Sequence, residues 1–341
     1  MGLTAGVCDG SLRPVCVAVA SLLQPIPRNP NKSFDKLNQE GVMRARASVL
    51  FLFGILACGA ATKSGAQANV VQFVSFDVPG ATLTRAIDVN GSGEIVGRFD
   101  DQNGTHGFLY SGGQFTTIDF PGSNFTIAIG INDSGQIVGR FMVNGEDHGF
   151  LFSNGLFVQI DVPGAVSTEC HGINSTGDIV GRQLTVKNSA QGGGSGRTTE
   201  RGYLLHAGQF TSIDFPNADT TDAWKIADDG RVVGDWSDSG TLRSGSLHGY
   251  IFNNGQFTSF DDPGVTGTAP REINSVNQVV GISLDKKLND HGFILMGGVY
   301  QGFDFPGSSF TDGNGINDQG MIVGGYIDSN GAQHGYAALV Q

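Results

Sequence analysis

Short apolar runs separated by glycine turns recur along the chain from residue 70 onward. The clearest copy of this unit covers residues 115–153, with the sequence FTTIDFPGSNFTIAIGINDSGQIVGRFMVNGEDHGFLFS. The unit recurs about every 42 residues, and six versions of it fill the rest of the chain. Such a period, made of short strands and Gly-rich turns, is typical of propellers and other arrays, because one unit cannot bury its own apolar faces.

Each unit predicts four strands joined by tight turns. In the copy above and its continuation, the strands are expected at 128–132, at 136–141, at 148–152 and in a segment that ends at Asp161. Asn154-Gly155 and its counterparts are two-residue hairpin turns, since the positive φ of these residues matches the twist of paired strands. The strands are apolar at consecutive positions, as in Ile137-Val138, so we expect both sheet faces to be buried by stacking of the units.

The hairpin register predicts a pair of polar residues in every unit. With Gly112-Gly113 as the turn, counting outward places His106 opposite Asp119, and directly opposed partners of this kind stabilise a sheet and fix its register. The same count gives these further structural pairs: His148 with Asp161, Arg201 with Asp214, His248 with Asp261, and His291 with Asp304.

The last unit contains His334 but ends before a strand that could supply its aspartate, whereas Asp77 stands unmatched at the other end of the repeats. If the strand before Asp77 joins the last unit, His334 meets Asp77 and no sheet edge stays open. The sequence therefore predicts an all-β fold, a closed six-bladed propeller with four-stranded blades over residues 69–341. Its last blade would combine one N-terminal strand with three C-terminal strands. An open solenoid or a sandwich is the alternative.

The combination of HGF before a glycine turn with INDSGQIVG in each unit resembles the HAF family of extracellular repeat proteins. The resemblance covers residues 70–341. The departures are Arg201 in place of His, Ala227 where other units have Asn, and Asn277 in place of the turn Gly. The resemblance implies secretion and a repeat fold, and it implies no activity and no catalytic residue.

The composition supports a repeat fold and excludes one class of partner. The chain has 53 glycines, and charged residues make up only 15% of its 341 residues. From residue 69 onward, 13 Lys and Arg face 29 Asp and Glu. This acidic balance argues against a nucleic-acid partner, which requires a basic surface.

The segment from Met43 to Ala68 has two arginines, an apolar stretch and small residues at its end, as in a secretory signal peptide cleaved after Ala68. We therefore expect a secreted or periplasmic protein. The apolar stretch is too short for a transmembrane anchor, which needs about 20 residues. A lipid attached to Cys58 is an alternative. Residues 1–42 match no targeting class, and we expect them to be an untranslated or disordered extension.

Cysteine usage leaves no internal disulfide after cleavage. Cys8, Cys16 and Cys58 precede the predicted cleavage site, so Cys170 is alone in the mature chain. Stability in an oxidising compartment must then come from packing and from closure of the repeats.

Three features that could suggest cofactors have simpler explanations, and we expect neither a metal nor another cofactor. The regularly spaced histidines each face their own carboxylate, whereas metal ligands must converge. The turns at Asn132-Asp133 and Asn317-Asp318 lack the later acidic ligand of a calcium loop. The glycine run at 192–196 has no strand-to-helix context for phosphate binding, and it is expected to be a flexible insertion.

A binding site is best sought where the units differ chemically, because packing demands sameness elsewhere. Two adjacent positions before the Ile-Asn pair differ most. They carry Ile87-Asp88, Ile129-Gly130, His171-Gly172, Trp224-Lys225, Arg271-Glu272 and Asn314-Gly315. In a propeller these positions lie near the mouth of the central channel. Nine of the 13 basic residues and both tryptophans fall within 183–290, which also contains the longest predicted insertions, at 183–200, 235–247 and 283–290.

These features predict a binding or interaction module for a glycan or an anionic extracellular ligand. Trp224 and Trp236 would stack on the ligand, and His171, Lys225, Arg271 and Glu272 would make polar contacts. A first alternative is a polysaccharide lyase or hydrolase with His171 and either Glu169 or Glu272 as acid and base. A second is a structural envelope or matrix protein without a small ligand. The ligand's identity and the oligomeric state do not follow from the sequence.

Overall fold

The structure, a computed structural model, describes residues 70–187, 197–238 and 247–340. All of them belong to the second of two compact units of the chain, residues 41–341. The predicted signal peptide, the extension before it and the glycine run at 192–196 lie outside the described residues. Within the described part, no helix is long and apolar enough to cross a membrane.

The strands follow one another in antiparallel groups of four. The first three groups are β2 (Leu83–Val89), β3 (Ile95–Asp101), β4 (Gly104–Ser111) and β5 (Gln114–Ile118); β6 (Thr126–Ile131), β7 (Ile137–Val143), β8 (Glu146–Ser153) and β9 (Leu156–Ile160); and β10 (Ser167–Ile173), β11 (Ile179–Lys187), β12 (Arg197–His206) and β13 (Gln209–Ile213).

The later groups continue this order. The fourth and fifth groups are β14 (Thr220–Ile226), β15 (Val232–Ser237), β16 (Leu247–Asn253) and β17 (Gln256–Phe260); and β18 (Gly267–Ile273), β19 (Val279–Leu284), β20 (Asp290–Met296) and β21 (Val299–Phe303). The last group contains two short inner strands, two long strands and the first strand of the described chain: β22 (Phe310–Thr311), β23 (Gly315–Ile316), β24 (Met321–Ile327), β25 (Gln333–Val340) and β1 (Val70–Phe76).

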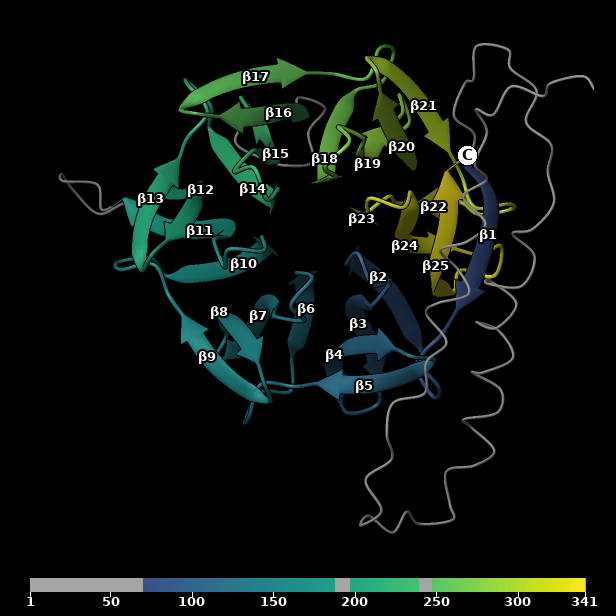
Figure 1. Cartoon of the computed structure of the whole chain (residues 1–341), viewed down its shortest axis with the longest axis horizontal. Helices are drawn as coiled ribbons and strands as arrows, with labels where there is room; N and C mark the ends of the chain where they lie inside the picture. Colours follow the sequence, from purple (N-terminus) through teal and green to yellow (C-terminus); the bar gives the residue numbers. More distant parts are fainter. Residues whose placement is uncertain (1–69, 188–196, 239–246, 341) are drawn as a thin grey trace, which may run out of the picture. The chain divides into compact units, whose positions relative to one another are not determined.

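The groups lie side by side around a common centre (Figure 1). The first strand of each of the first five groups is innermost, and the fourth is outermost. Single parallel bridges, from Glu200 to Thr220 and from Leu247 to Gly267, join the third, fourth and fifth groups into one sheet. No sheet within the described residues closes on itself. The predicted all-β, antiparallel architecture is confirmed.

The apolar cores lie between neighbouring groups. Val138 of the second group packs in one buried cluster with Ile173 and Tyr203 of the third. Another cluster joins Phe108 of the first group to Ala337 of the last. Both faces of the strands are therefore covered, which explains why apolar residues occur at consecutive positions in the sequence.

Strand β1 pairs antiparallel with β25 and carries the N-terminal end of the repeats into the last group (Figure 1). Phe76 lies opposite Gly335, and the His334 Nδ1 atom lies 2.9 Å from an Asp77 carboxylate oxygen. This pairing covers an edge of β25 that would otherwise be open to other strands.

The other predicted polar pairs also lie in contact, each between the third strand of its group and the aspartate that directly follows the fourth strand. The distances between the His106, His148, His248 or His291 Nδ1 atom and its aspartate oxygen are 2.8, 2.9, 3.0 and 2.9 Å, and the Arg201 Nε atom lies 2.9 Å from Asp214. Two-residue turns place these partners in register.

A belt of asparagine side chains explains the Ile-Asn motif. The amide Nδ2 of Asn132 donates to the backbone carbonyl of Asn174 in the next group at 2.9 Å. Equivalent bonds join these pairs: Asn90 to Asn132, Asn274 to Asn317, and Asn317 to Asn90. Ala227 occupies the same turn position without an amide, so it can donate no such bond.

The aspartates of the neighbouring turns also link groups. Asp133 and Asp318 accept hydrogen bonds from the backbone amides of Gly91 and Ser275 in the preceding groups, at 2.7 and 2.8 Å. The Asn-Asp turns therefore have a structural explanation that requires no calcium ion.

The insertion expected at 183–200 is partly regular. Residues 183–187 and 197–200 extend β11 and β12 as a paired hairpin, with Gln183 opposite Arg201 and Thr185 opposite Thr199. The prediction of a loop was wrong at both ends of this segment, because hydrogen bonding between the two strands continues past the unit's usual length.

Candidate functional site

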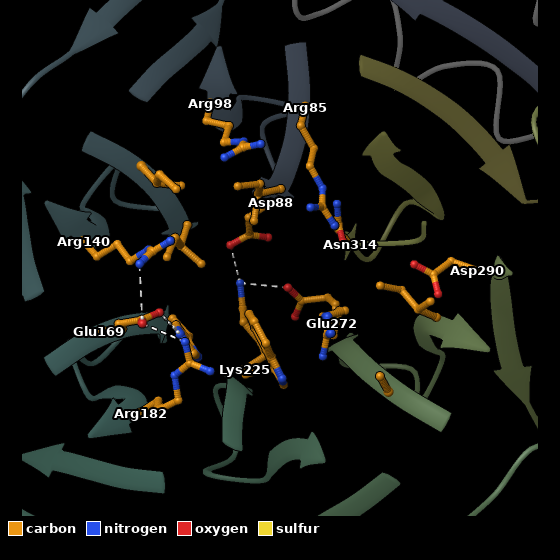
Figure 2. A pocket seen from close by; sticks show the side chains of 18 of the residues that line it. Arg85, Asp88, Arg98, Arg140, Glu169, Arg182, Lys225, Glu272, Asp290 and Asn314 are labelled. Carbon is orange, nitrogen blue, oxygen red and sulfur yellow. Dashed lines mark hydrogen bonds and ion pairs between the residues drawn. The ribbon is translucent and has the colours of Figure 1, made fainter. Parts of the chain in front are cut away.

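A pocket of about 730 Å³ opens where the inner strands approach one another (Figure 2). This volume is in the range of small-molecule sites, which span about 300–1,000 Å³. Five of the six predicted ligand-binding residues line it: His171, Trp224, Lys225, Arg271 and Glu272. Ile87, Asp88, Ile129 and Asn314 from the divergent positions do so as well.

Bulges in the inner strands direct side chains into this pocket. In each of the first five groups one inner-strand residue has no partner in the ladder: Ile87, Ile129, His171, Trp224 and Arg271. An extra residue of this kind bends the strand and changes the direction of its side chain. All five residues line the pocket.

The position after each bulge is glycine in some units because the next inner strand packs closely against it. The expectation that chemical differences between units mark ligand contacts was therefore wrong for these glycines. A Cβ atom on Gly172 would lie 2.8 Å from the Lys225 Cα atom, and one on Gly315 would lie 2.9 Å from the Asp88 Cα atom. The backbone of the next inner strand leaves no room for a side chain there.

Trp236 does not line this pocket, so it is not placed to contact a ligand that binds there. Its indole ring stacks on Phe215 at 4.2 Å and on His248 at 4.5 Å. Trp236 lies opposite His248 in the ladder, as Phe99 lies opposite His106. It therefore occupies a regular aromatic position of the repeat that supports the histidine pair.

Trp224 lines the pocket, but its stacking role was also predicted wrongly, because both faces of its indole are covered. His171 stacks on it at 4.2 Å, and the Arg271 guanidinium lies 3.9 Å from the ring centroid. Asp235 accepts hydrogen bonds from Trp224 Nε1 at 2.7 Å and from Arg271 Nη1 at 2.8 Å. Arg271 is thus held by a cation–π contact and an ion pair.

Lys225 and Glu272 belong to a buried ionic cluster with Asp88 (Figure 2). The Lys225 Nζ atom lies 2.6 Å from Asp88 Oδ2 and 2.9 Å from Glu272 Oε2. Lys225 and Glu272 also line a second cavity of about 390 Å³ near the asparagine belt, so the cluster lies between the two cavities.

Protonation in this cluster follows from burial and charge. Burial raises the pKa of Glu272 well above its usual value, and the nearby Asp88 carboxylate adds to the effect, while Lys225 opposes it. The pKa of Lys225 is raised too, because its two carboxylate partners outweigh burial. We therefore expect Lys225 to be charged and Glu272 to take up a proton more readily than an exposed carboxyl group does.

Glu169 lies in a second ionic network at the pocket wall (Figure 2). It accepts a hydrogen bond from Arg182 Nη2 at 2.7 Å and lies 3.2 Å from His171 Nε2 and 3.6 Å from Arg140 Nη1. Burial would raise the pKa of Glu169, but the hydrogen bond to His171 and the charges of the two arginines outweigh burial and lower it.

The geometry brings together one acid–base pair of the enzymatic alternative but leaves it buried. His171 and Glu169 are in contact, but the His171 side chain is fully buried beneath Trp224 and its other nitrogen faces the Ala223 carbonyl. The carboxyl group with a raised pKa, Glu272, pairs with Lys225. Among the described residues, no group of three or more His, Cys, Asp and Glu could hold a metal ion.

Arg85, Arg98 and Arg140 form a cationic wall of the pocket (Figure 2) that was not predicted. Arg85 pairs with Asp312, and Arg140 pairs with Asp147 at 2.9 Å. In the part of the chain that the structure describes, the Arg98 side chain makes no hydrogen bond or ion pair, and its buried Nε atom has no partner. Burial lowers the pKa of Arg98, and the charges of Arg85 and Arg140 lower it further, against the effect of Asp100.

The sequence contained a signal for this wall. After the Val-Gly of the second strand, the units carry Arg98, Arg140, Arg182, Asp235, Ile282 and Gly325. This position is as divergent as those chosen before. The sequence instead favoured a site among the basic residues of 183–290. The arginines that line the pocket before that segment are Arg85, Arg98, Arg140 and Arg182.

The fifth group lines the pocket with the charged residues Arg271, Glu272 and Asp290 and also contributes most of an apolar part of the wall. Ala269 and Ile282 face each other in the ladder, as Arg85 and Arg98 do in the first group. The apolar residues that line this side are Leu247, Ala269, Ile282, Leu284, Leu288 and Phe310. Asp290, at the start of β20, lies across the pocket from Arg140 (Figure 2).

Comparison with known proteins supports the fold. The chain matches no family model and no curated protein. A TolB-like protein from Agrobacterium tumefaciens is similar with a TM-score of 0.52 and 15% identity, over 78% of this chain and 92% of that chain. The β-propeller domain of the Trilobed protease from Pyrococcus furiosus gives a TM-score of 0.47 and 11% identity, over 76% and 81%.

A lectin is among the similar structures as well. The fucose-specific lectin from Aleuria aurantia gives a TM-score of 0.47 and 12% identity, over 77% of this chain and 96% of that chain. Similarity at this level of identity concerns the fold alone. The arrangement of the strand groups and the similarity to the TolB-like protein show a β-propeller fold, and any function has to be argued from the pocket of this chain.

Proposed function

We propose that residues 69–341 form a closed six-bladed β-propeller of HAF-type repeats. We also propose that the protein is exported and that its signal peptide is cleaved between Ala68 and Asn69. The strand groups, the apolar clusters between neighbours and the pairing of β1 with β25 support this architecture. A crystal structure in which β1 lies away from β25 would refute the closed ring. N-terminal sequencing of exported protein should give Asn69 as its first residue, and any other start would refute the cleavage site.

We further propose that this propeller is a binding module for an anionic ligand in the central pocket. The carrying observation is the Arg98 guanidinium, which lines the pocket between two other arginines and makes no ion pair with any carboxylate of the described residues. An unpaired, partly desolvated cation is costly, and an anion that binds to it recovers that free energy. The ligand contact is therefore ionic, because Trp224 has no free face for stacking on a glycan.

The geometry favours this function over both alternatives. The enzymatic alternative needs an accessible acid and base, but His171 is buried and Glu272 is paired with Lys225. A purely structural role would not require a pocket of about 730 Å³ with an unpaired cation in its wall.

The test is calorimetric titration with small anions and their neutral counterparts, such as glucuronate with glucose and octanoate with octanol. We expect at least one anion to bind, and Arg98→Gln to weaken it by about tenfold or more, since hydrogen bonds to charged groups contribute about 1.5–3 kcal/mol. Lys287→Gln is the control, because it removes an exposed positive charge outside the pocket lining. If Arg98→Gln binds every anion as well as the parent does, the proposal is wrong.

A further inference from the structure

The two walls of the pocket differ in a way that narrows the class of ligand. At equivalent positions of the ladder, the first group places Arg85 and Arg98, whereas the fifth group places Ala269 and Ile282. Leu247, Ala269 and Ile282 form one apolar cluster, and Leu284 packs against it. One part of the pocket wall is therefore cationic, and another part is apolar.

Leu288 extends the apolar wall to the rim in an unfavourable backbone conformation. Its φ angle is +62°, a left-handed conformation that costs a residue with a Cβ atom free energy. Its side chain lines the pocket and is 55% exposed. An apolar residue that is both strained and exposed has no evident stabilising role, and strain of this kind is found at functional sites.

The equivalent turn of the last group shows which residue this backbone favours. Leu288 N donates to Asp285 O, and Gly331 N donates to Asp328 O in the same arrangement. Gly331 adopts its φ angle of +85° without a Cβ penalty. The fifth unit thus has leucine where the turn itself favours glycine, and this leucine faces the pocket.

From these two walls we infer that the ligand is an organic anion with an apolar body. This inference rests on the proposed function and specifies its ligand. The anionic group would bind at Arg98, between Arg85 and Arg140, and the apolar body would lie against Ile282, Leu284 and Leu288.

The experiment compares octanoate with glucuronate and with octanol by calorimetric titration, below the concentration at which octanoate forms micelles. We expect octanoate to bind more tightly than either of the other two. Leu288→Asn should weaken octanoate by about fivefold, because roughly half of a leucine side chain loses its apolar contact, and should leave glucuronate unchanged. The same substitution should raise the melting temperature, since asparagine tolerates a left-handed φ.

Leu156→Asn is the matched control, since Leu156 is 71% exposed at the start of β9 and does not line the pocket. It should change neither affinity. If glucuronate binds at Arg98 as tightly as octanoate, or Leu288→Asn leaves octanoate binding unchanged, the apolar body is refuted while the anion site stands. If both anions bind to Arg98→Gln as tightly as to the parent, both proposals are refuted.

Discussion

Lys225 is the cation that contacts the buried carboxyl groups of Asp88 and Glu272. Its replacement therefore gives the sharpest test of how this ionic cluster is stabilised. Its side chain is 11% exposed, and those of Asp88 and Glu272 are 4% and 5% exposed. Lys225→Met keeps the apolar stem and removes only the charge. The two carboxyl groups then face each other without a positive charge between them.

Breaking a buried pair by removing one partner costs about 3–5 kcal/mol, because the other charge is left uncompensated. Asp88 keeps hydrogen bonds from the backbone amides of Val89 and Ile131, at 2.7 and 2.8 Å. Glu272 can take up a proton. We therefore expect a loss near the lower end, about 3 kcal/mol, which is a large share of a typical stability of 5–15 kcal/mol.

The loss should depend on pH with a defined sign. The pKa of Glu272 is already raised in the folded protein, and it rises further without Lys225. A carboxyl group with a raised folded pKa adds stability below its unfolded pKa, and this stability is lost as pH rises through the folded value. The deficit of Lys225→Met should thus be smaller at about pH 5 than at about pH 8.

Urea unfolding followed by circular dichroism measures the difference between the two midpoints. Adding Glu272→Gln to Lys225→Met should restore part of the stability at the higher pH, because a neutral amide replaces an unpaired charge. Lys287→Met, on an exposed loop, should change little. A Lys225→Met protein as stable as its parent, or a deficit independent of pH, would refute a charged Lys225 between these carboxyl groups.

Three further predictions follow from the fold. Asn132→Ala should cost about 1–3 kcal/mol in urea unfolding, because the Asn174 carbonyl loses its donor. Ala227→Asn should add up to about 1.5 kcal/mol by supplying the donor that is missing at this position of the belt. Equal unfolding midpoints for the parent and both variants would contradict the role of the belt. Burial lowers the pKa values of His106 and His291, but each histidine contacts two aspartates, and these contacts raise both pKa values overall. The variant His106→Gln/His291→Gln should therefore lose less than about 1 kcal/mol of stability per site at about pH 6 and hardly any at about pH 9. A larger loss at the higher pH would refute this sign. Deleting residues 70–77 should expose the edge of β25 and cause self-association, which size-exclusion chromatography would detect. A monomer with the parent's melting temperature would show that β1 does not protect this edge.

The repeat architecture could be predicted from the sequence because its determinants are local. A two-residue turn fixes which residues face each other, so the partners His106 and Asp119 could be found by counting. The contact between His334 and Asp77 joins opposite ends of the repeats, but it follows the same register once the chain is treated as cyclic. Five of the six proposed ligand contacts line the pocket for a related reason, since the inner-strand position recurs in every unit.

The chemistry of the pocket could not be predicted in the same way, because it depends on contacts between units. Bulges turn Trp224 toward the pocket, and neighbours from other strands, His171 and Arg271, then cover both its faces. Trp236 looked equivalent in the sequence, yet the strand alternation places it against Phe215. An aromatic residue at a divergent position therefore predicts proximity to a site, and only its packing shows whether a face is free.

Charge balance separates the ligand contacts from the scaffold in this pocket. Arg98 and Arg140 follow the same Val-Gly motif on equivalent strands, and both line the pocket. Arg140 is neutralised by Asp147, which comes from the adjacent strand β8, whereas Arg98 makes no ion pair within the described residues. An arginine that recurs at one position of the unit can thus stabilise the fold in one unit and bind the ligand in another. Its role depends on whether the neighbouring strand supplies a carboxylate. Arg98→Gln should therefore reduce anion binding with little loss of stability, and Arg140→Gln should cost stability by leaving Asp147 without its cation.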